Sequence, residues 1–219
     1  MTGPTNREEG AMSAAALLSR DPGGEGFTVA DLHALPDGGP RYELIDGSII
    51  VSPSATHAHN IVARWFANAL DEARPSDEYV VGTDQSTVID EHNELRPDVD
   101  VARARALETT PFPISDLVLA VEVVSPKSSW LRDTETKRAL YARAGVPSYW
   151  IVVPEDDAPT IAVAELVLDE QTGQYAYRTH YTTDVFTAER PWPVTIDLPA
   201  MTARRARLLE QASKGAGPC

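Results

Sequence analysis

The sequence contains very little cysteine and no long apolar run. Its single cysteine, among 219 residues, is Cys219, which excludes an internal disulfide and a metal site built from several cysteines. No apolar run approaches the roughly 20 residues that a membrane-spanning helix needs. The N-terminus has no basic segment followed by an apolar core, so a secretory signal is not indicated. The default expectation is therefore a cytoplasmic protein.

Basic residues are also scarce. The chain has 19 Lys and Arg residues against 33 Asp and Glu residues, and its formal net charge is -14. A protein that coats nucleic acid needs a basic face for the phosphates, so this balance argues against that class, although a local basic groove stays open. The sequence also shows no internal repeat, no glycine-rich phosphate loop and no G-x-S-x-G motif.

The size and the hydrophobic content of 42% are sufficient for one substantial core. Residues 1–26 are rich in Gly, Ala, Pro and charge, which predicts a disordered N-terminal tail. We expect a single domain over residues 27–213 and a frayed C-terminus over residues 214–219.

The most informative segment is Leu117–Val124, which is apolar at every position except Glu122. Apolar residues at both parities are typical of a strand that is covered on both faces, so the segment predicts a central strand of an α/β sheet. An unpaired carboxylate in such a strand is costly to desolvate. Glu122 therefore needs a cation, a hydrogen-bonding network or a metal ion as its partner.

A candidate partner follows on the next predicted helix, Leu131–Ala144, which ends at Gly145 and Pro147. Helical spacing places Asp133 and Lys137 on the same face as apolar residues, so both are expected to point toward the sheet. Two interpretations stay open at this point. Glu122 and Lys137 could form a buried structural ion pair, or they could belong to a metal-dependent hydrolytic site with further carboxylates.

Further polar candidates lie earlier in the chain. Glu43 belongs to the predicted hairpin Arg41–Ser52, which has an Asp-Gly turn, and a strand glutamate is usually exposed. Asp98 and Asp100 share one face of a strand, which indicates either a solvated edge or a cation site. His57 and His59 lie in the first turn of a helix that runs to about Ala73; they face different directions, and one of them could lie over a site.

The remaining segments complete the predicted fold. We expect a short capped helix at 28–35, a turn at 90–94 and an irregular segment that extends through Pro199. The chain from Ala203 is predicted to be helical. The predicted strands are 79–82, 86–89, 148–153 and the two strands of a C-terminal hairpin, 160–168 and 174–181.

Four segments together resemble a known family. They are YELIDGSIIVSPSATHAHN, RPDVDV, DLVLAVEVVSP and DTETKRALYARAGVPSYWIVVP. In order, spacing and flanking residues they are similar to the Uma-two family of restriction endonuclease-like proteins, within the PD-(D/E)xK nuclease superfamily. The resemblance covers roughly residues 27–199. It implies a mixed α/β (α+β) fold in which a central sheet is flanked by helices, with an N-terminal β-hairpin and a C-terminal hairpin.

The resemblance also implies a site and a cofactor. Asp98, Glu122 and the carbonyl of Val123 would hold Mg²⁺ or Mn²⁺, and Glu43 would be a further acidic group. The superfamily motif places its lysine where this chain has Val124, and Lys137 on the following helix is the natural substitute. The implied catalytic residues are thus Glu43, Asp98, Glu122 and Lys137, with His57 and Asp133 as possible accessory groups.

The function implied is a metal-dependent endonuclease that acts on DNA. A homodimer is plausible by analogy, because cleavage of two strands suits two sites related by a twofold axis. The acidic net charge and Val124 favour an alternative, a non-catalytic binding or regulatory module on the same fold.

Overall fold

The computed structural model describes residues 24, 26–36, 40–52, 54–124, 130, 132–155 and 157–215. The predicted N-terminal tail and frayed C-terminus therefore lie almost entirely outside the described residues. Internal contacts divide the chain into two compact units, residues 1–54 with 88–95 and residues 55–87 with 96–219. The single domain expected over residues 27–213 stays a prediction.

The first unit contains the predicted hairpin. Its turn residues Asp46 and Gly47 have φ values of 45° and 71°, as a two-residue turn with left-handed residues requires. The predicted capping box is also present. The side chain of Thr28 accepts from the backbone N–H of Asp31, and the side chain of Asp31 accepts from the backbone N–H of Thr28. The elements of this unit are α2 (Val29–His33), β1 (Arg41–Ile45), β2 (Ser48–Ser52), β5 (Asn93–Leu95) and β4 (Thr87–Asp90), whose first residue belongs to the second unit.

The turn expected at residues 90–94 is shorter than predicted. Only the two residues between β4 and β5 form the turn, and the next three residues make β5, which pairs with β1 through Leu44 and Glu94. Asn93 explains the difference, since its side chain bonds Asp90 and the backbone of Asp46. A turn-favouring residue is thus used here to join two strands.

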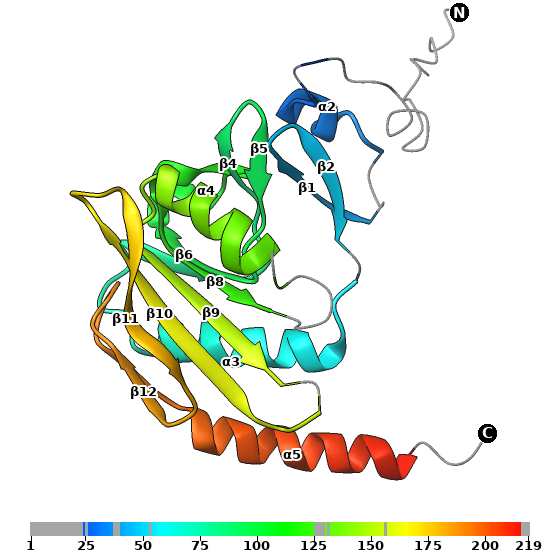
Figure 1. The fold of residues 1–219 in the computed structure, drawn as a ribbon, viewed down its shortest axis with the longest axis vertical. Coiled ribbons are helices and arrows are strands. Elements are labelled where there is room, and N and C mark those ends of the chain that lie inside the picture. Colours follow the sequence, from blue (N-terminus) through cyan, green and yellow to red (C-terminus); the bar gives the residue numbers. More distant parts are fainter. Residues whose placement is uncertain are drawn as a thin grey trace, which may run out of the picture. The chain divides into compact units, whose positions relative to one another are not determined.

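The second unit is built on a six-stranded sheet of order β11-β10-β9-β8-β6-β3 (Figure 1). Strands β8 and β9 are parallel and their other pairings are antiparallel, so the sheet is mixed. Both lie in the sheet interior, as their uncharged or nearly uncharged sequences predict. The strands are β3 (Tyr79–Gly82), β6 (Val99–Arg103), β8 (Leu117–Val123), β9 (Ser148–Pro154), β10 (Ile161–Asp169) and β11 (Gln174–Thr182).

Helices cover both faces of this sheet. Helix α3 (His57–Glu72) lies on one face and α4 (Arg138–Arg143), preceded by a π-helical turn at Arg132–Lys137, lies on the other (Figure 1). Short elements complete the connections between β6 and β8. They are the 3₁₀ turns Ala104–Ala106 and Ile114–Asp116 and the strand β7 (Phe112–Pro113). A mixed sheet flanked by helices, with hairpins near both ends of the chain, confirms the predicted fold class.

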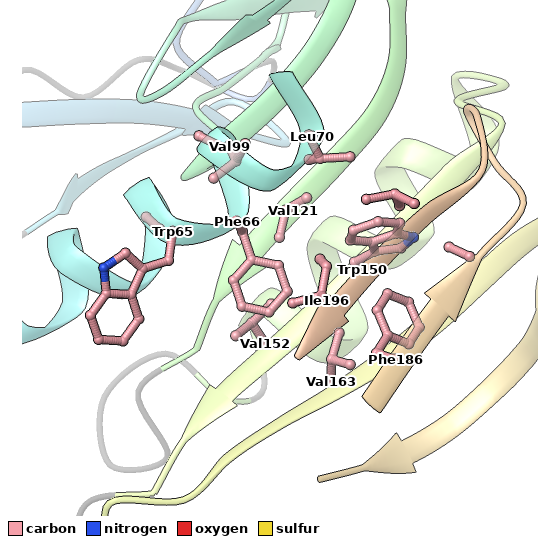
Figure 2. Packing of buried hydrophobic residues seen from close by; sticks show 14 of the residues in the cluster. Trp65, Phe66, Leu70, Val99, Val121, Trp150, Val152, Val163, Phe186 and Ile196 are labelled. Atoms are coloured by element: carbon pink, nitrogen blue, oxygen red, sulfur yellow. The ribbon is translucent and has the colours of Figure 1, made fainter. Parts of the chain in front are cut away.

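The main hydrophobic core lies on the α3 face of the sheet. Phe66 points from α3 toward Val121, Val152 and Ile196, and is fully buried (Figure 2). Trp150 of β9 meets Phe186 edge-to-face, with their ring centroids 5.0 Å apart. The alternation along β6 and β8 directs their valines into this core, so the residues between them point to the α4 face.

The prediction of an irregular segment through Pro199 was wrong. That region forms the hairpin β12 (Val185–Ala188) and β13 (Val194–Asp197), and α5 (Leu198–Gly215) begins before the expected Ala203. The prolines of this region explain the error: Pro199 lies in the first turn of α5, where the missing N–H is not needed. Asp197 caps the helix by accepting from the backbone N–H of Ala200 at 2.8 Å. Within the described residues, no helix has both the length and the apolar character required to cross a membrane.

Candidate active site

A buried ion pair lies at the centre of the second unit. The Nζ atom of Lys137 donates to Oε1 of Glu122 at 3.0 Å, and the side chains are only 4% and 3% exposed. The hydroxyl of Tyr141 donates to the same oxygen at 3.2 Å. One carboxylate oxygen therefore accepts from an ammonium group and a phenol, which provides the compensation that a glutamate in an interior strand requires.

The local sequence explains why these three groups meet. Glu122 occupies the α4-facing parity of β8, whose neighbours are apolar. The segment after β8 returns over this face as a π-helical turn that ends at Lys137 and continues as α4. Helical spacing then brings Tyr141 one turn beyond Lys137, on the same side of the helix. The sequence predicted a plain α-helix here; π-helical turns occur frequently at functional sites.

Asp98 lies beside this pair. It immediately precedes β6, in which Val99 pairs with Val121, so the same register continues to Asp98 and Glu122 as neighbours. The Oδ2 atom of Asp98 accepts from the backbone N–H of Val123 at 2.7 Å. Its side chain is 22% exposed, in contrast to Glu122. The arrangement is therefore a buried pair, Glu122 and Lys137, with a second carboxylate, Asp98, that is partly accessible to solvent.

His59 contacts two oxygen atoms of the site, one from Val123 and one from Asp98. Its Nε2 atom lies 2.8 Å from the carbonyl oxygen of Val123 and 3.3 Å from Oδ2 of Asp98. Both partners are acceptors, so Nε2 carries the proton and donates to them. The Nδ1 atom lies 3.4 Å from the amide oxygen of Asn60, another acceptor, which suits a doubly protonated ring. A hydrogen-bond donor on α3 thus lies against one carboxylate and one carbonyl.

These contacts raise the pKa of His59 above its ordinary value of 6.5. Burial is the largest effect and opposes protonation, but the hydrogen bond and negative charge of Asp98, together with the bonds to Val123 and Asn60, outweigh it. Because the pKa is higher in the folded state, the stabilisation by His59 is complete below the unfolded pKa of about 6.5 and disappears as pH rises through the folded pKa.

We expect His59→Gln to destabilise the metal-free protein at acidic pH and to have little effect at alkaline pH. The reason is that glutamine keeps a donor but cannot acquire the positive charge that Asp98 stabilises. Urea unfolding of the wild type and the variant in EDTA, at about pH 5.5 and pH 9, gives the two differences. A difference that stays constant or grows with pH would show that His59 does not carry this charge.

Asp100, which lies in β6, is a buried carboxylate like Glu122 of β8. It is 2% exposed, and its Oδ1 atom has no hydrogen-bond partner within the described part of the chain. Burial raises the pKa of Asp100 to about 7. A side chain at Gly82, its partner in β3, would place a Cβ only 2.5 Å from Oδ1, so glycine leaves the space that this carboxyl occupies. Sequence analysis left Asp98 and Asp100 open between a solvated edge and a cation site. The structure places Asp100 in β6 and Asp98 directly before that strand, and neither is fully solvated.

The other predicted residues have different positions. Glu43 lies in β1 of the first unit, where it is buried and pairs with Ile50, so its role in a site of the second unit stays a prediction. His57 is exposed in the first turn of α3. The side chain of Asp133 is outside what the structure describes. Val124, at the usual lysine position, is fully buried, and its N–H donates to Val152.

Two contacts of the site were not foreseen. His59, rather than His57, reaches Asp98, and the available signal was its spacing to the buried Val62 and Phe66 on the same helical face. Tyr141, whose hydroxyl bonds Glu122, was not predicted as a residue of the site. A phenol among apolar residues is usually part of the core, and no sequence feature distinguishes it.

Fold and site together define a protein of the restriction-endonuclease-like class. The chain belongs to the Uma2 (Uma-two) family, whose model, described as "Putative restriction endonuclease", matches residues 29–199. This match confirms the family resemblance found in the sequence and supports a nuclease function in general terms. None of the curated proteins compared with the chain matches it.

A solved structure has the same fold. The chain is similar to the crystal structure of a "putative nuclease belonging to DUF820" from Anabaena variabilis, with a TM-score of 0.64 and 15% sequence identity. The similarity covers 82% of this chain and 99% of that chain. At this identity the comparison establishes the fold alone, and the roles of individual residues rest on the geometry above.

Proposed function

We propose that the chain is a Mg²⁺- or Mn²⁺-dependent nuclease that hydrolyses DNA phosphodiester bonds. The observation that carries the proposal is the solvent-accessible Asp98 beside the buried Glu122–Lys137 pair. A purely structural ion pair needs no second, solvent-accessible carboxylate next to it. Glu43 is proposed as a further acidic group of the site.

The donor atoms suit a hard divalent cation. The carboxylate of Asp98 and the carbonyl of Val123 both lie against one proton donor, His59 Nε2, so two oxygens already converge on one point. Such oxygens are the ligands that Mg²⁺ and Mn²⁺ prefer. No group of three His, Cys, Asp or Glu side chains that could hold a metal is found among the described residues, so the proposed set relies on the backbone carbonyl. A bound divalent cation would supply charge stabilisation for the phosphate and a more acidic water.

The side chains of the chain have distinct roles in this proposal. Lys137 is held by Glu122 in a fixed position, from which its ammonium group stabilises negative charge that develops on the phosphate. Tyr141 donates to the same oxygen of Glu122 and so helps to orient the glutamate that holds Lys137. His59 donates to the carboxylate of Asp98 and the carbonyl of Val123 in the metal-free protein, and must release these oxygens when a cation binds.

A second candidate function is a non-catalytic binding or regulatory module. The buried Val124 at the usual lysine position and the net charge of -14 favour it. The two candidates differ in one measurable respect, since only the enzyme requires the cation for turnover. A homodimer stays a prediction for both.

The expected result is metal-dependent cleavage of DNA. Supercoiled plasmid incubated with the purified chain should be nicked or linearised in Mg²⁺ or Mn²⁺ and stay intact when EDTA removes the cation, because the chain then lacks the group that activates water. Gel electrophoresis over time gives the rate. Cleavage that persists in EDTA would contradict the metal requirement. DNA that stays intact with both cations, while the protein binds it, would favour the non-catalytic module.

A further inference from the structure

A surface cluster of flat side chains lies on the α4 face of the sheet, next to the candidate active site. It consists of Trp130, Arg138, Tyr177, His180 and Tyr181, and we call it the aromatic patch. Its three largest rings, Trp130, Tyr177 and Tyr181, are 39%, 37% and 40% exposed. They account for three of the eight large apolar side chains exposed on the described part of the chain. A cluster of this kind generally marks an interaction site.

The rings of the patch are stacked with one another. Trp130 and Tyr181 lie with centroids 6.2 Å apart at an interplanar angle of 27°, and Tyr177 and His180 with centroids 4.8 Å apart at 18°. The guanidinium of Arg138 lies over Tyr177, 5.5 Å from the ring centroid, while its Nη2 donates to the carbonyl of Tyr175. These contacts hold the rings in place, so a planar ligand would meet a preformed surface.

The patch is connected to the candidate active site. Arg138 directly follows Lys137 in sequence, so adjacent residues face Glu122 and the patch. A buried row of rings links the same places: Tyr141, which bonds Glu122, contacts Tyr149 with centroids 5.3 Å apart, and Tyr149 contacts Tyr175 with centroids 5.7 Å apart. The patch and the candidate active site are thus joined both along the helical segment and through this row of rings.

The segments that form the patch contain more basic than acidic residues, unlike the chain as a whole. Strand β11 contains Arg178 and His180 and no acidic residue. The helical segment 132–143 has four basic residues against two acidic ones, Asp133 and Glu135, in a chain whose overall ratio is 19 to 33. Glu135 interacts with Tyr181 and is an acidic neighbour of the patch. Basic groups beside exposed rings suit a ligand that combines phosphates with planar groups.

We propose that the aromatic patch binds the unpaired bases of single-stranded DNA and presents that strand to the site of Asp98, Glu122 and Lys137. This proposal rests on the nuclease function proposed above and names its substrate class. Bases of a single strand have open faces for stacking on Trp130, Tyr177 and Tyr181, whereas the bases of a duplex are already stacked and enclosed. Arg138 contributes a cation beside the phosphates.

Tryptophan fluorescence tests the proposal directly. Of the four tryptophans, Trp65, Trp150 and Trp192 are buried and only Trp130 is exposed, so quenching by a DNA strand reports on the patch. The full chain is titrated in EDTA with oligothymidylate of about 12 nucleotides, within the range of site sizes known for single-strand binders, and with a duplex of equal length. We expect saturable quenching by the single strand, weaker binding of the duplex, and no quenching in Trp130→Phe.

Anisotropy of a labelled oligothymidylate then measures affinity in variants. The double variant Tyr177→Ala/Tyr181→Ala should bind at least about tenfold more weakly, as expected from the loss of two stacking rings. The matched control is Leu208→Ala/Leu209→Ala, which removes two exposed apolar side chains from α5 and should bind as the wild type does. Equal binding of duplex and single strand, or an equal loss in the control, would overturn the proposal.

Two other outcomes distinguish a failure of the aromatic patch to bind DNA from a failure of the proposed nuclease function. Cleavage of DNA without quenching of Trp130 would contradict binding at the aromatic patch and still support the nuclease function. Binding of the single strand through the patch without metal-dependent cleavage would support the patch and remove the nuclease. Because β11 is an edge strand, a second copy of the chain could cover the patch instead. Trp130 emission that changes with protein concentration in the absence of DNA, together with a dimer in sedimentation, would overturn the proposal in that way.

Discussion

Replacing Lys137 by methionine is expected to lower the free energy of unfolding by about 3–5 kcal/mol, because it leaves the carboxylate of Glu122 buried without its cation. The ion pair is almost fully enclosed, and the hydroxyl of Tyr141, which also donates to Oε1, is neutral and does not replace the lost positive charge. Methionine has nearly the length and shape of lysine, so the loss reports on the charge rather than on packing. Urea unfolding at neutral pH, followed by circular dichroism, measures the difference.

The chain contains a matched control for this substitution. Lys214 also donates to a glutamate, Glu210, at 2.6 Å, but both side chains are more than 60% exposed. Lys214→Met should therefore cost no more than about 1 kcal/mol. The double variant Lys137→Met/Glu122→Gln should recover most of the stability lost in Lys137→Met, because glutamine removes the unpaired charge and can still accept from Tyr141. A double variant as unstable as Lys137→Met would show that packing, and not charge, causes the loss.

The same double variant separates structure from catalysis. If Lys137 and Glu122 only stabilise the fold, a stable double variant keeps every activity of the wild type. If they also act on the phosphate, the variant is folded and inactive. The stability and cleavage measurements together thus distinguish the two interpretations that the sequence left open for this pair.

The Glu122–Lys137 pair could be predicted because its causes are local. A strand that is apolar at both parities is predicted to be an interior strand. Helical spacing is enough to predict that Lys137 lies on the helix face that points toward the sheet. The two residues also belong to consecutive elements, so no long-range topology had to be known. The same reasoning applies to the Asp-Gly hairpin, in which the turn alone determines the register.

The contact between His59 and Asp98 could not be predicted in this way. It depends on how α3 is placed over the end of β8, which is set by the packing of Phe66 and the other core residues of α3 against several strands. The helix pattern shows that His57 and His59 point in different directions, but not which of the two reaches Asp98 and the end of β8. The aromatic patch was hidden for a related reason, because Trp130 and β11 are far apart in sequence and meet only through the sheet order.

Neutralising Asp98 or Glu122 is expected to abolish binding of Mn²⁺ and to reduce DNA cleavage at least about hundredfold, as the loss of several kcal/mol of charge stabilisation implies. Asp98→Asn keeps an oxygen that can accept from the N–H of Val123, and Glu122→Gln keeps an acceptor for Tyr141, so both variants preserve the local hydrogen bonds. Calorimetric titration with Mn²⁺ and the plasmid assay measure the two effects, after unfolding curves have shown that each variant is folded.

Asp71→Asn is the matched control for these variants. Asp71 is an exposed aspartate of α3 that pairs with Arg74, so the same change there should alter neither Mn²⁺ binding nor cleavage. The two site variants also differ from each other in an instructive way. Asp98 is partly open to solvent and bonded by His59, whereas Glu122 is enclosed with Lys137, so Asp98→Asn should affect stability less than Glu122→Gln. A folded Asp98→Asn that binds Mn²⁺ as the wild type does would move the cation site away from this end of β6 and leave Asp98 as a partner of His59 alone.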